Sequence, residues 1–192
     1  MKKFLILILL AIIFTSVLFS CEIKNNPAAN PASDFEYTID GDNVTITKFI
    51  GTSEELIIPD KIDGKSVTTI GRMAFMYNNF TKIVIPDSVT TIEDHAFAYS
   101  VLLTTVTLSK NITTIDYSIF RDCGSLSSII IPEGVTAING IAFRGCVSLA
   151  DLSIPDSVIF IADEAFAQCD LITGETREKI LKINPKAFDD TL

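Results

Sequence analysis

A 23-residue unit that recurs along the chain is the feature that most restricts how this sequence can fold. The stretch IPEGVTAINGIAFRGC, from Ile131 to Cys146, returns as IPDSVIFIADEAFAQC, from Ile154 to Cys169. Self-similarity at a fixed period is typical of repeat architectures, in which each unit is one supersecondary element. Copies without gaps begin at Phe80, Leu103, Leu126 and Leu149, and a less regular copy with a loop insertion covers 56–79.

Two short apolar clusters in each unit predict two short strands. The pattern LxxIxI ends in strand-like alternation, VTxI is rich in β-branched residues, and a Pro turn separates them. Neither cluster could bury itself alone, so the units must stack as coils, with neighbouring strands about 4.8 Å apart. Identical side chains then form internal columns. We expect one column of Ile85, Leu108, Ile131 and Ile154, and another of Phe75, Phe97, Phe120, Phe143 and Phe166.

The full pattern, LxxIxIPxxVTxIxxxAFxxCxx, resembles the BspA-like leucine-rich repeat family. The resemblance implies a mainly β, right-handed leucine-rich-repeat solenoid over residues 35–192, and an interaction protein of the bacterial surface without a shared catalytic motif. FEYTIDGDNVTITKF (Phe35 to Phe49) looks like the β-hairpin cap that opens such domains. TREKILK has helical composition, and we expect a short helix over 174–182 to cap the other end of the stack. The chain departs from the pattern at Leu108-Ser109, which replaces Ile-Pro, and at Tyr99-Ser100, where Cys often ends the repeat.

The N-terminus has the layout of a secretory signal. Lys2 and Lys3 precede an apolar run from Phe4 to about Val17, which is too short for a stable membrane span. LFSC, ending at Cys21, resembles a bacterial lipobox, in which the chain is cut before the Cys and the thiol carries lipid. An ordinary signal peptide with a coincidental Cys is the alternative. The sequence thus predicts a lipoprotein signal peptide over 1–20 and a Pro-, Asn- and Ala-rich flexible tether over 21–34.

The acidic charge balance disfavours polyanionic partners. The formal net charge is −9, and removal of 1–20 would lower the basic residues from 15 to 13 against 24 acidic ones, giving about −11. Such a chain repels nucleic acid and anionic lipid. We therefore expect no nucleic-acid partner and membrane attachment through the lipid anchor alone.

Three cysteines and one histidine are the residues most able to carry chemistry. Cys123, Cys146 and Cys169 share one position in successive coils, and inert buried thiols, one disulfide or a metal site are all open readings. No CxxC pair accompanies them, so we predict no metal site and no cofactor. His95 has no neighbouring nucleophile motif, and we interpret it as a turn or surface residue.

The first strand of each coil should present two outward side chains, the third and fifth residues of LxxIxI. These residues form our predicted binding face, a flat strip of small polar groups mixed with aliphatic ones that suits an extended protein or glycan. An ordinary solvated sheet face is the alternative. The predicted face comprises Glu55, Ile57, Lys82, Val84, Thr105, Thr107, Ser128, Ile130, Asp151 and Ser153.

Two further columns lie outside the predicted face. Tyr77 and Tyr99 stand two residues after the core Phe and could form an aromatic contact pair or cover the turn. The position after the Pro turn is mostly acidic, and we interpret it as solvated turn residues rather than a Ca²⁺ ladder. It holds Asp60, Asp87, Lys110, Glu133 and Asp156.

These features together predict a non-catalytic, extracytoplasmic binding or adhesion module, lipid-anchored to a bacterial membrane and exposed on the cell surface. The alternative is a structural cell-envelope lipoprotein without a soluble ligand. An enzyme is disfavoured because no nucleophile, metal-ligand set or carboxylate pair emerges from the sequence.

Overall fold

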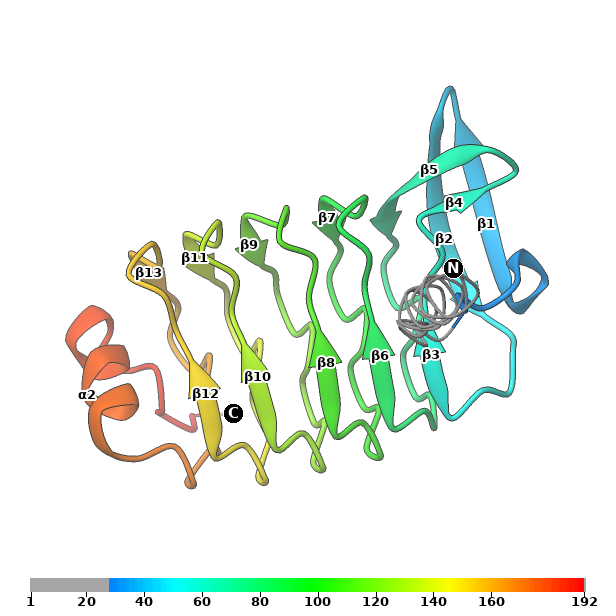
Figure 1. The fold of residues 1–192 in the computed structure, drawn as a ribbon. Helices are drawn as coiled ribbons and strands as arrows, with labels where there is room; N and C mark the ends of the chain where they lie inside the picture. The colour runs from blue at the N-terminus through cyan, green and yellow to red at the C-terminus, as the bar shows by residue number, and fades with distance from the viewer. Residues whose placement is uncertain (1–27, 192) are drawn as a thin grey trace, which may run out of the picture.

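The computed structural model describes residues 28–191, and in it the repeats wind into a right-handed, mainly β solenoid (Figure 1). Each coil climbs along one strand, crosses the top through a second short strand and returns along the back. The predicted leucine-rich-repeat architecture is therefore confirmed.

The N-terminal cap is an antiparallel hairpin of β1 (Phe35–Asp40) and β2 (Asn43–Phe49), as predicted. Gly41, with φ +58°, lies in the turn that joins the two strands. The hairpin continues into the first coil because β2 pairs in parallel with β5 (Lys65–Ile70). The insertion in the first repeat becomes a second hairpin, in which β4 (Lys61–Ile62) pairs antiparallel with β5.

Five parallel strands, one from each coil, form the front sheet of the solenoid. The middle residue of each three-residue strand is buried and its two neighbours are more exposed, which is the alternation expected of a half-buried sheet. In chain order these strands are β3 (Glu55–Ile57), β6 (Lys82–Val84), β8 (Thr105–Thr107), β10 (Ser128–Ile130) and β12 (Asp151–Ser153).

A second row of short strands closes the top of the coils. β7 (Thr91–Ile92) pairs with β5, whereas β9 (Thr114–Ile115), β11 (Ala137–Ile138) and β13 (Phe160–Ile161) form a separate parallel sheet. These strands are the VTxI clusters of the repeat, so both predicted strands of each unit are present.

The back of each coil is a chain of tight turns in which two residues, four positions apart, have a positive φ. In one coil His95 and Tyr99 adopt φ values of 60° and 61°. Their N–H groups donate to the next coil, to Tyr117 O at 3.1 Å and Arg121 O at 2.7 Å. Glycine fills one such position: a Cβ on Gly145 would come within 2.2 Å of Asp122 Oδ1. The turns thus satisfy the backbone without a regular strand.

Stacked phenylalanine rings run through the core. Successive rings of Phe75, Phe97, Phe120, Phe143 and Phe166 have centroids 5.2–5.5 Å apart and interplanar angles of 18° or less. All five side chains are fully buried. The column matches the spacing of neighbouring strands, so the same residue packs above itself in each coil.

Side chains close both ends of the front sheet. On the N-terminal side, Asn30 Oδ1 accepts a hydrogen bond from the N–H of Ile57 at 2.9 Å, and the Asn30 N–H donates to Ile57 O at 2.9 Å. The short 3₁₀ helix η1 (Ala32–Asp34) follows, and Asp34 O accepts from Ile50 N. The folded domain thus begins at Asn30, inside the range assigned to the tether, while residues 1–27 lie outside the described part.

The C-terminal cap is helix α2 (Gly174–Ile183), close to the predicted 174–182. Its side chains occupy free carbonyl groups of the last coil: Thr176 Oγ1 donates to Leu152 O at 3.3 Å and Lys179 Nζ to Ile154 O at 2.8 Å. Just beyond the helix, Asn184 Nδ2 donates to Ile161 O at 2.9 Å. Edge carbonyl groups that another coil would otherwise satisfy are therefore covered.

Removal of a phenyl ring should cost most in the middle of the stack. Phe120 has a stacked ring on each side, whereas Phe188 contacts Phe166 on one side and the Arg177 guanidinium, 3.8 Å from its ring centroid, on the other. We expect Phe120→Ala to lower the free energy of unfolding by about 3–5 kcal/mol and Phe188→Ala by about 1–2 kcal/mol. Urea denaturation measures both losses. Equal losses would contradict nearest-neighbour coupling between coils.

Candidate functional site

All ten residues of the predicted binding face lie on the five strands of the front sheet. The inward residues between them, such as Leu56, Ile83 and Ile129, are buried in the core. The most exposed of its aliphatic members is Ile130, with 74% of its surface accessible. The pleat thus brings the ten side chains to one surface, although their role in binding stays a prediction.

The composition of this front face changes along the solenoid axis. At the N-terminal end Lys82 Nζ lies 3.7 Å from Glu55 Oε2. The centre is uncharged, with Thr105 paired in register with Ser128. At the C-terminal end of the face, Asp151 on β12 again presents a charged carboxylate. A neutral centre between charged ends resembles the organisation of protein interfaces, in which charge is depleted at the core.

A hollow opens between β8 and β10 at the centre of the face. β6 and β8 pair over three residues, but β8 and β10 pair only at Thr105 and Ser128. The N–H of Ile85 donates to Thr107 O at 2.9 Å. Among residues 28–191 the N–H of Leu108 makes no equivalent hydrogen bond to Ile130 O. The resulting cavity has a volume of about 390 Å³ and is bordered by Thr107, Ile130 and Pro132. The sequence indicated a flat strip and gave no sign of this hollow.

The residues that follow the Pro turn are partly neutralised by cations. The backbone N–H of Lys110 donates to Asp87 Oδ1 at 3.0 Å, and its ammonium group lies 3.5 Å from Asp87 Oδ2. The hydrogen bond from this N–H lowers the pKa of the Asp87 carboxyl group. Lys179 Nζ from α2 lies 2.6 Å from Asp156 Oδ1, and the hydrogen bond from this ammonium group, together with its charge, lowers the pKa of the Asp156 carboxyl group. Among residues 28–191 no cluster of three acidic, Cys or His residues could hold a metal ion.

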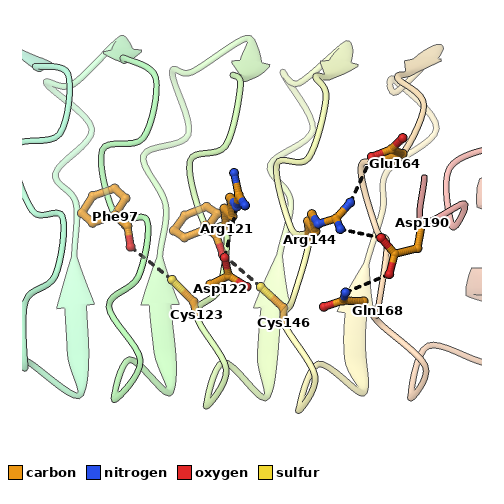
Figure 2. A network of polar contacts seen from close by, with 10 residues as sticks. Phe97, Arg121, Asp122, Cys123, Arg144, Cys146, Glu164, Gln168 and Asp190 are labelled. Carbon is orange, nitrogen blue, oxygen red and sulfur yellow. Dashed lines mark hydrogen bonds and ion pairs between the residues drawn. The ribbon is translucent and has the colours of Figure 1, made fainter. Parts of the chain in front are cut away.

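The three repeat cysteines are free thiols that donate hydrogen bonds to the preceding coil. Figure 2 shows two of them, Cys123 and Cys146. Cys123 Sγ donates to Phe97 O at 3.2 Å, and Cys146 Sγ to Phe120 O at 3.1 Å. Ser100 does the same one coil earlier, through Oγ to Phe75 O at 2.9 Å. The position therefore needs a small buried donor, which explains why Ser replaces Cys in the pattern.

Burial makes these thiols weak acids. Removal from water raises the pKa of Cys123 and of Cys169 to about 12, and burial also raises the pKa of Cys146. Because the thiolate is the reactive form, these side chains are poor nucleophiles and poor metal ligands. Of the readings left open by the sequence, inert buried thiols fit the structure.

His95 lies on the back of the solenoid, in one of the left-handed turn positions. Its ring packs at a tilt against Tyr117, with centroids 5.5 Å apart. His95 Nδ1 and, one coil on, Ser118 Oγ are buried without a hydrogen-bond partner in the described part of the chain. A general base requires an oriented partner. The geometry thus agrees with a turn residue.

Tyr77 and Tyr99 stack on each other, with centroids 4.9 Å apart and an interplanar angle of 19°. The Arg121 guanidinium lies 5.5 Å from the Tyr99 ring centroid, and Arg121 Nε is 3.1 Å from Asp122 Oδ2. The sequence pattern indicated the tyrosine pair but not Arg121, which directly follows the core residue Phe120 and is equivalent to Ala98 in the preceding coil.

A polar network fastens the C-terminal segment to the last coils (Figure 2). The nearly buried guanidinium of Arg144 donates to Glu164 Oε2 at 3.0 Å and also to Asp190. Gln168 Nε2 donates to Asp190 Oδ2 at 2.8 Å, and this bond together with the charge of Arg144 lowers the pKa of Asp190. We assign the network to the end of the stack, because it ties the last turn of chain to the coil beneath it.

The predicted lipidation site, Cys21, and the signal over 1–20 lie outside the described residues. Within 28–191 no helix has the length and apolar character needed to cross a membrane.

These observations define the class of protein: a leucine-rich-repeat solenoid with one sheet face and one row of turns. A model of the BspA type leucine rich repeat region matches residues 68–192 in six copies. The chain belongs to this family. A search of curated proteins found no match.

Solved structures support the same fold. A leucine-rich repeat protein from Bacteroides ovatus is 26% identical, with a TM-score of 0.66 over 77% of this chain and 40% of that one. One from Bacteroides capillosus is 28% identical, with a TM-score of 0.58 over 66% of this chain and 98% of that one. A leucine rich cell surface protein from Faecalibacterium prausnitzii is 24% identical, with a TM-score of 0.54 over 77% of this chain and 54% of that one. The chain thus spans about half or less of two of these neighbours.

The buried thiols predict that the folded domain loses stability at alkaline pH. Their pKa values are raised on folding from an ordinary value of 9.0, so the stability that they contribute is complete below pH 9 and is lost as the pH rises from 9 towards 12. At pH 10 each thiol should remove about 1 kcal/mol from the free energy of unfolding. The triple variant Cys123→Ser, Cys146→Ser, Cys169→Ser should lose this part of the pH dependence. Urea denaturation at pH 8 and about pH 10 measures the loss of unfolding free energy between these two pH values. An equal loss in the triple variant and in the unmodified protein would contradict the assignment.

Proposed function

We propose that this protein is a non-catalytic binding module that uses the front sheet to hold an extended segment of a protein ligand. The observation that carries the proposal is the hollow beside Ile130, an exposed aliphatic side chain at the neutral centre of a polar face. A contact of this kind combines an apolar anchor point with a solvated rim, as protein interfaces do. Because each coil offers only two outward side chains, a ligand must cross several coils.

The location that suits this activity is the outside of a bacterial cell. Two features support this part of the proposal: the lipobox that ends at Cys21, and the description of the Faecalibacterium prausnitzii neighbour as a cell surface protein. Lipidation of Cys21 would attach the domain to a membrane, with acyl chains supplying the affinity that the acidic surface lacks.

The chemistry of the candidate catalytic residues supports the non-catalytic part of the proposal. The repeat thiols are buried and protonated, and His95 makes no hydrogen bond within 28–191 that would orient it as a base. Two of the acidic side chains beyond the Pro turn, Asp87 and Asp156, pair with lysines.

A charge placed at the centre of the face should weaken binding. Thr107→Lys and Ile130→Lys would each place a solvated ammonium beside the hollow without touching the core, because both residues point outward. We expect each to weaken binding by at least about tenfold, since removal of a central contact costs about 1–2 kcal/mol or more. The ligand would come from a screen of the domain against extracellular matrix proteins, with affinities measured by surface plasmon resonance.

Thr113→Lys is the matched control. It is the same substitution in the same coil, at an exposed position outside the front sheet, whereas Asp156 is unsuitable because it pairs with Lys179 of the cap. The control should bind as the unmodified protein does, and all three variants should keep its melting temperature. Equal affinities for Thr107→Lys, Ile130→Lys and Thr113→Lys would move the site off the front sheet.

Membrane attachment has its own test. Cys21→Ala removes the only atom to which a lipobox enzyme could attach lipid, so the variant should leave the membrane fraction and should not incorporate labelled fatty acid in the native host. Cys123→Ala, which alters a buried thiol of the repeat, is the control and should still be labelled. A Cys21→Ala protein that stays labelled and membrane-bound would overturn the lipoprotein assignment.

A further inference from the structure

A second hollow lies next to the starts of β3 and β6, where the first coil meets the loop that leads into it, and none of the ten residues of the predicted binding face line it. It has a volume of about 660 Å³, within the range of about 300–1,000 Å³ typical of small-molecule sites. One wall is the loop 51–54, and the opposite wall is the turn from Tyr77 to Thr81. Phe49 and Phe80, both buried, lie at its base, and their rings are 6.1 Å apart between centroids.

Tyr77 gives this hollow an exposed aromatic wall. The Tyr99 ring covers one side of Tyr77, and Tyr99 is in turn covered by Arg121 from the next coil. Tyr77 is therefore the last ring of a stack that runs back towards the N-terminus, and 66% of its surface remains accessible. No further ring contacts it in the described part of the chain, and Tyr77 is one of the residues that line the hollow.

The backbone that carries the stack is fixed by hydrogen bonds between coils. Both tyrosines have φ near 60°, and their N–H groups donate to Ala98 O at 3.1 Å and Arg121 O at 2.7 Å. An aromatic side chain on a fixed backbone offers contact area at a small entropic cost.

The opposite wall is also fixed. Ser53 Oγ accepts a hydrogen bond from Asn30 Nδ2 at 2.8 Å, and the N–H of Thr81 donates to Glu54 O at 2.7 Å, which joins the two walls. Gly51 approaches Phe49 so closely that a Cβ would lie 2.8 Å from the ring. The hollow is therefore a built feature of the junction and does not depend on a movable loop.

Polar groups around the hollow are free to bind a ligand. The amide of Asn79 and the carboxylate of Glu54 make no hydrogen bond or ion pair within 28–191, and the amide of Asn78 makes only a long contact of 3.5 Å with Met76 O. An amide both donates and accepts, and a carboxylate accepts from hydroxyl groups. The carboxylate of Glu54 and the net charge of −9 disfavour an anionic ligand.

From this arrangement we infer that the hollow beside Tyr77 binds a neutral carbohydrate, specifically a β-1,4-linked chain of gluco-configured pyranose rings. Such a ring has equatorial hydroxyl groups around its edge and apolar C–H groups on its faces. One face packs on the open side of Tyr77, while Asn78, Asn79 and Glu54 take the edge hydroxyl groups. The site is separate from the front sheet, and it stands or fails independently of the protein-binding function proposed above.

Two soluble trisaccharides, chitotriose and cellotriose, test the inference on the full-length chain by saturation-transfer NMR and by titration of tyrosine fluorescence. The sequence has no Trp and only four Tyr, so a sugar on Tyr77 should change the emission directly. We expect both sugars to bind, and maltotriose, whose α-links bend the chain away from a flat platform, to bind more weakly. Tyr77→Ala should weaken binding by about tenfold, whereas Tyr77→Phe, which keeps the ring, should change it by less than about threefold.

Controls separate this site from other surfaces. Tyr117→Ala removes another exposed tyrosine far from the hollow, and Thr107→Lys alters the front sheet; neither should affect sugar binding. Asn79→Ala, which leaves the stack intact, should weaken binding several-fold. Failure of both β-1,4 trisaccharides to bind, or equal binding by Tyr77→Ala and the unmodified protein, would overturn the inference. If Thr107→Lys loses sugar binding while Tyr77→Ala keeps it, the sugar binds on the front sheet instead.

Discussion

The register between successive coils is the constraint on which the rest of this structure depends. Parallel backbone hydrogen bonds set the spacing of neighbouring coils at about 4.8 Å, and the stacked phenyl rings, 5.2–5.5 Å apart between centroids, fill the interior at a closely similar spacing. Hydrogen bonds and ring packing therefore reinforce one another only when each residue lies above its equivalent one repeat earlier. A one-residue shift in any coil would place Phe, Ile and Cys against the wrong neighbours and turn outward side chains inward.

The same constraint creates a problem at both ends, because the last coil always has unpaired backbone groups. The protein solves it with side chains instead of further strands. Asn30 pairs with the free edge of β3, while Thr176, Lys179 and Asn184 cover carbonyl groups of the last coil. The Arg144 network then fastens the segment beyond the helix. Each cap uses donors or acceptors on flexible stems, which tolerate the irregular geometry of a chain end better than a strand would.

Register also explains where binding surfaces can form. In a regular stack each outward position becomes a column, so function is expected where a column is interrupted. The front sheet is interrupted between β8 and β10, where strand pairing is reduced to a single residue pair and Ile130 is exposed. The row of turns is interrupted where the first coil meets the N-terminal cap, and there the tyrosine stack ends on a hollow. Both candidate sites thus occur at irregularities of an otherwise repeating surface.

The sequence by itself determined the repeat length, the two strands of each coil, the columns of Phe and Ile, the hairpin at Phe35–Phe49 and the helical cap. These features follow from the local pattern of apolar residues and from the stacking of one repeat on the next. It also identified which side chains face outward on the front sheet, since strand alternation fixes them. Only the tertiary structure decided the docking of Asn30, the hollow between β8 and β10 and the cavity beside Tyr77. Each of these joins segments whose contact depends on small departures from the average coil geometry, such as a missing hydrogen bond or a loop pinned by a distant side chain. A repeat pattern describes the average coil, and it carries no information about how one coil differs from it.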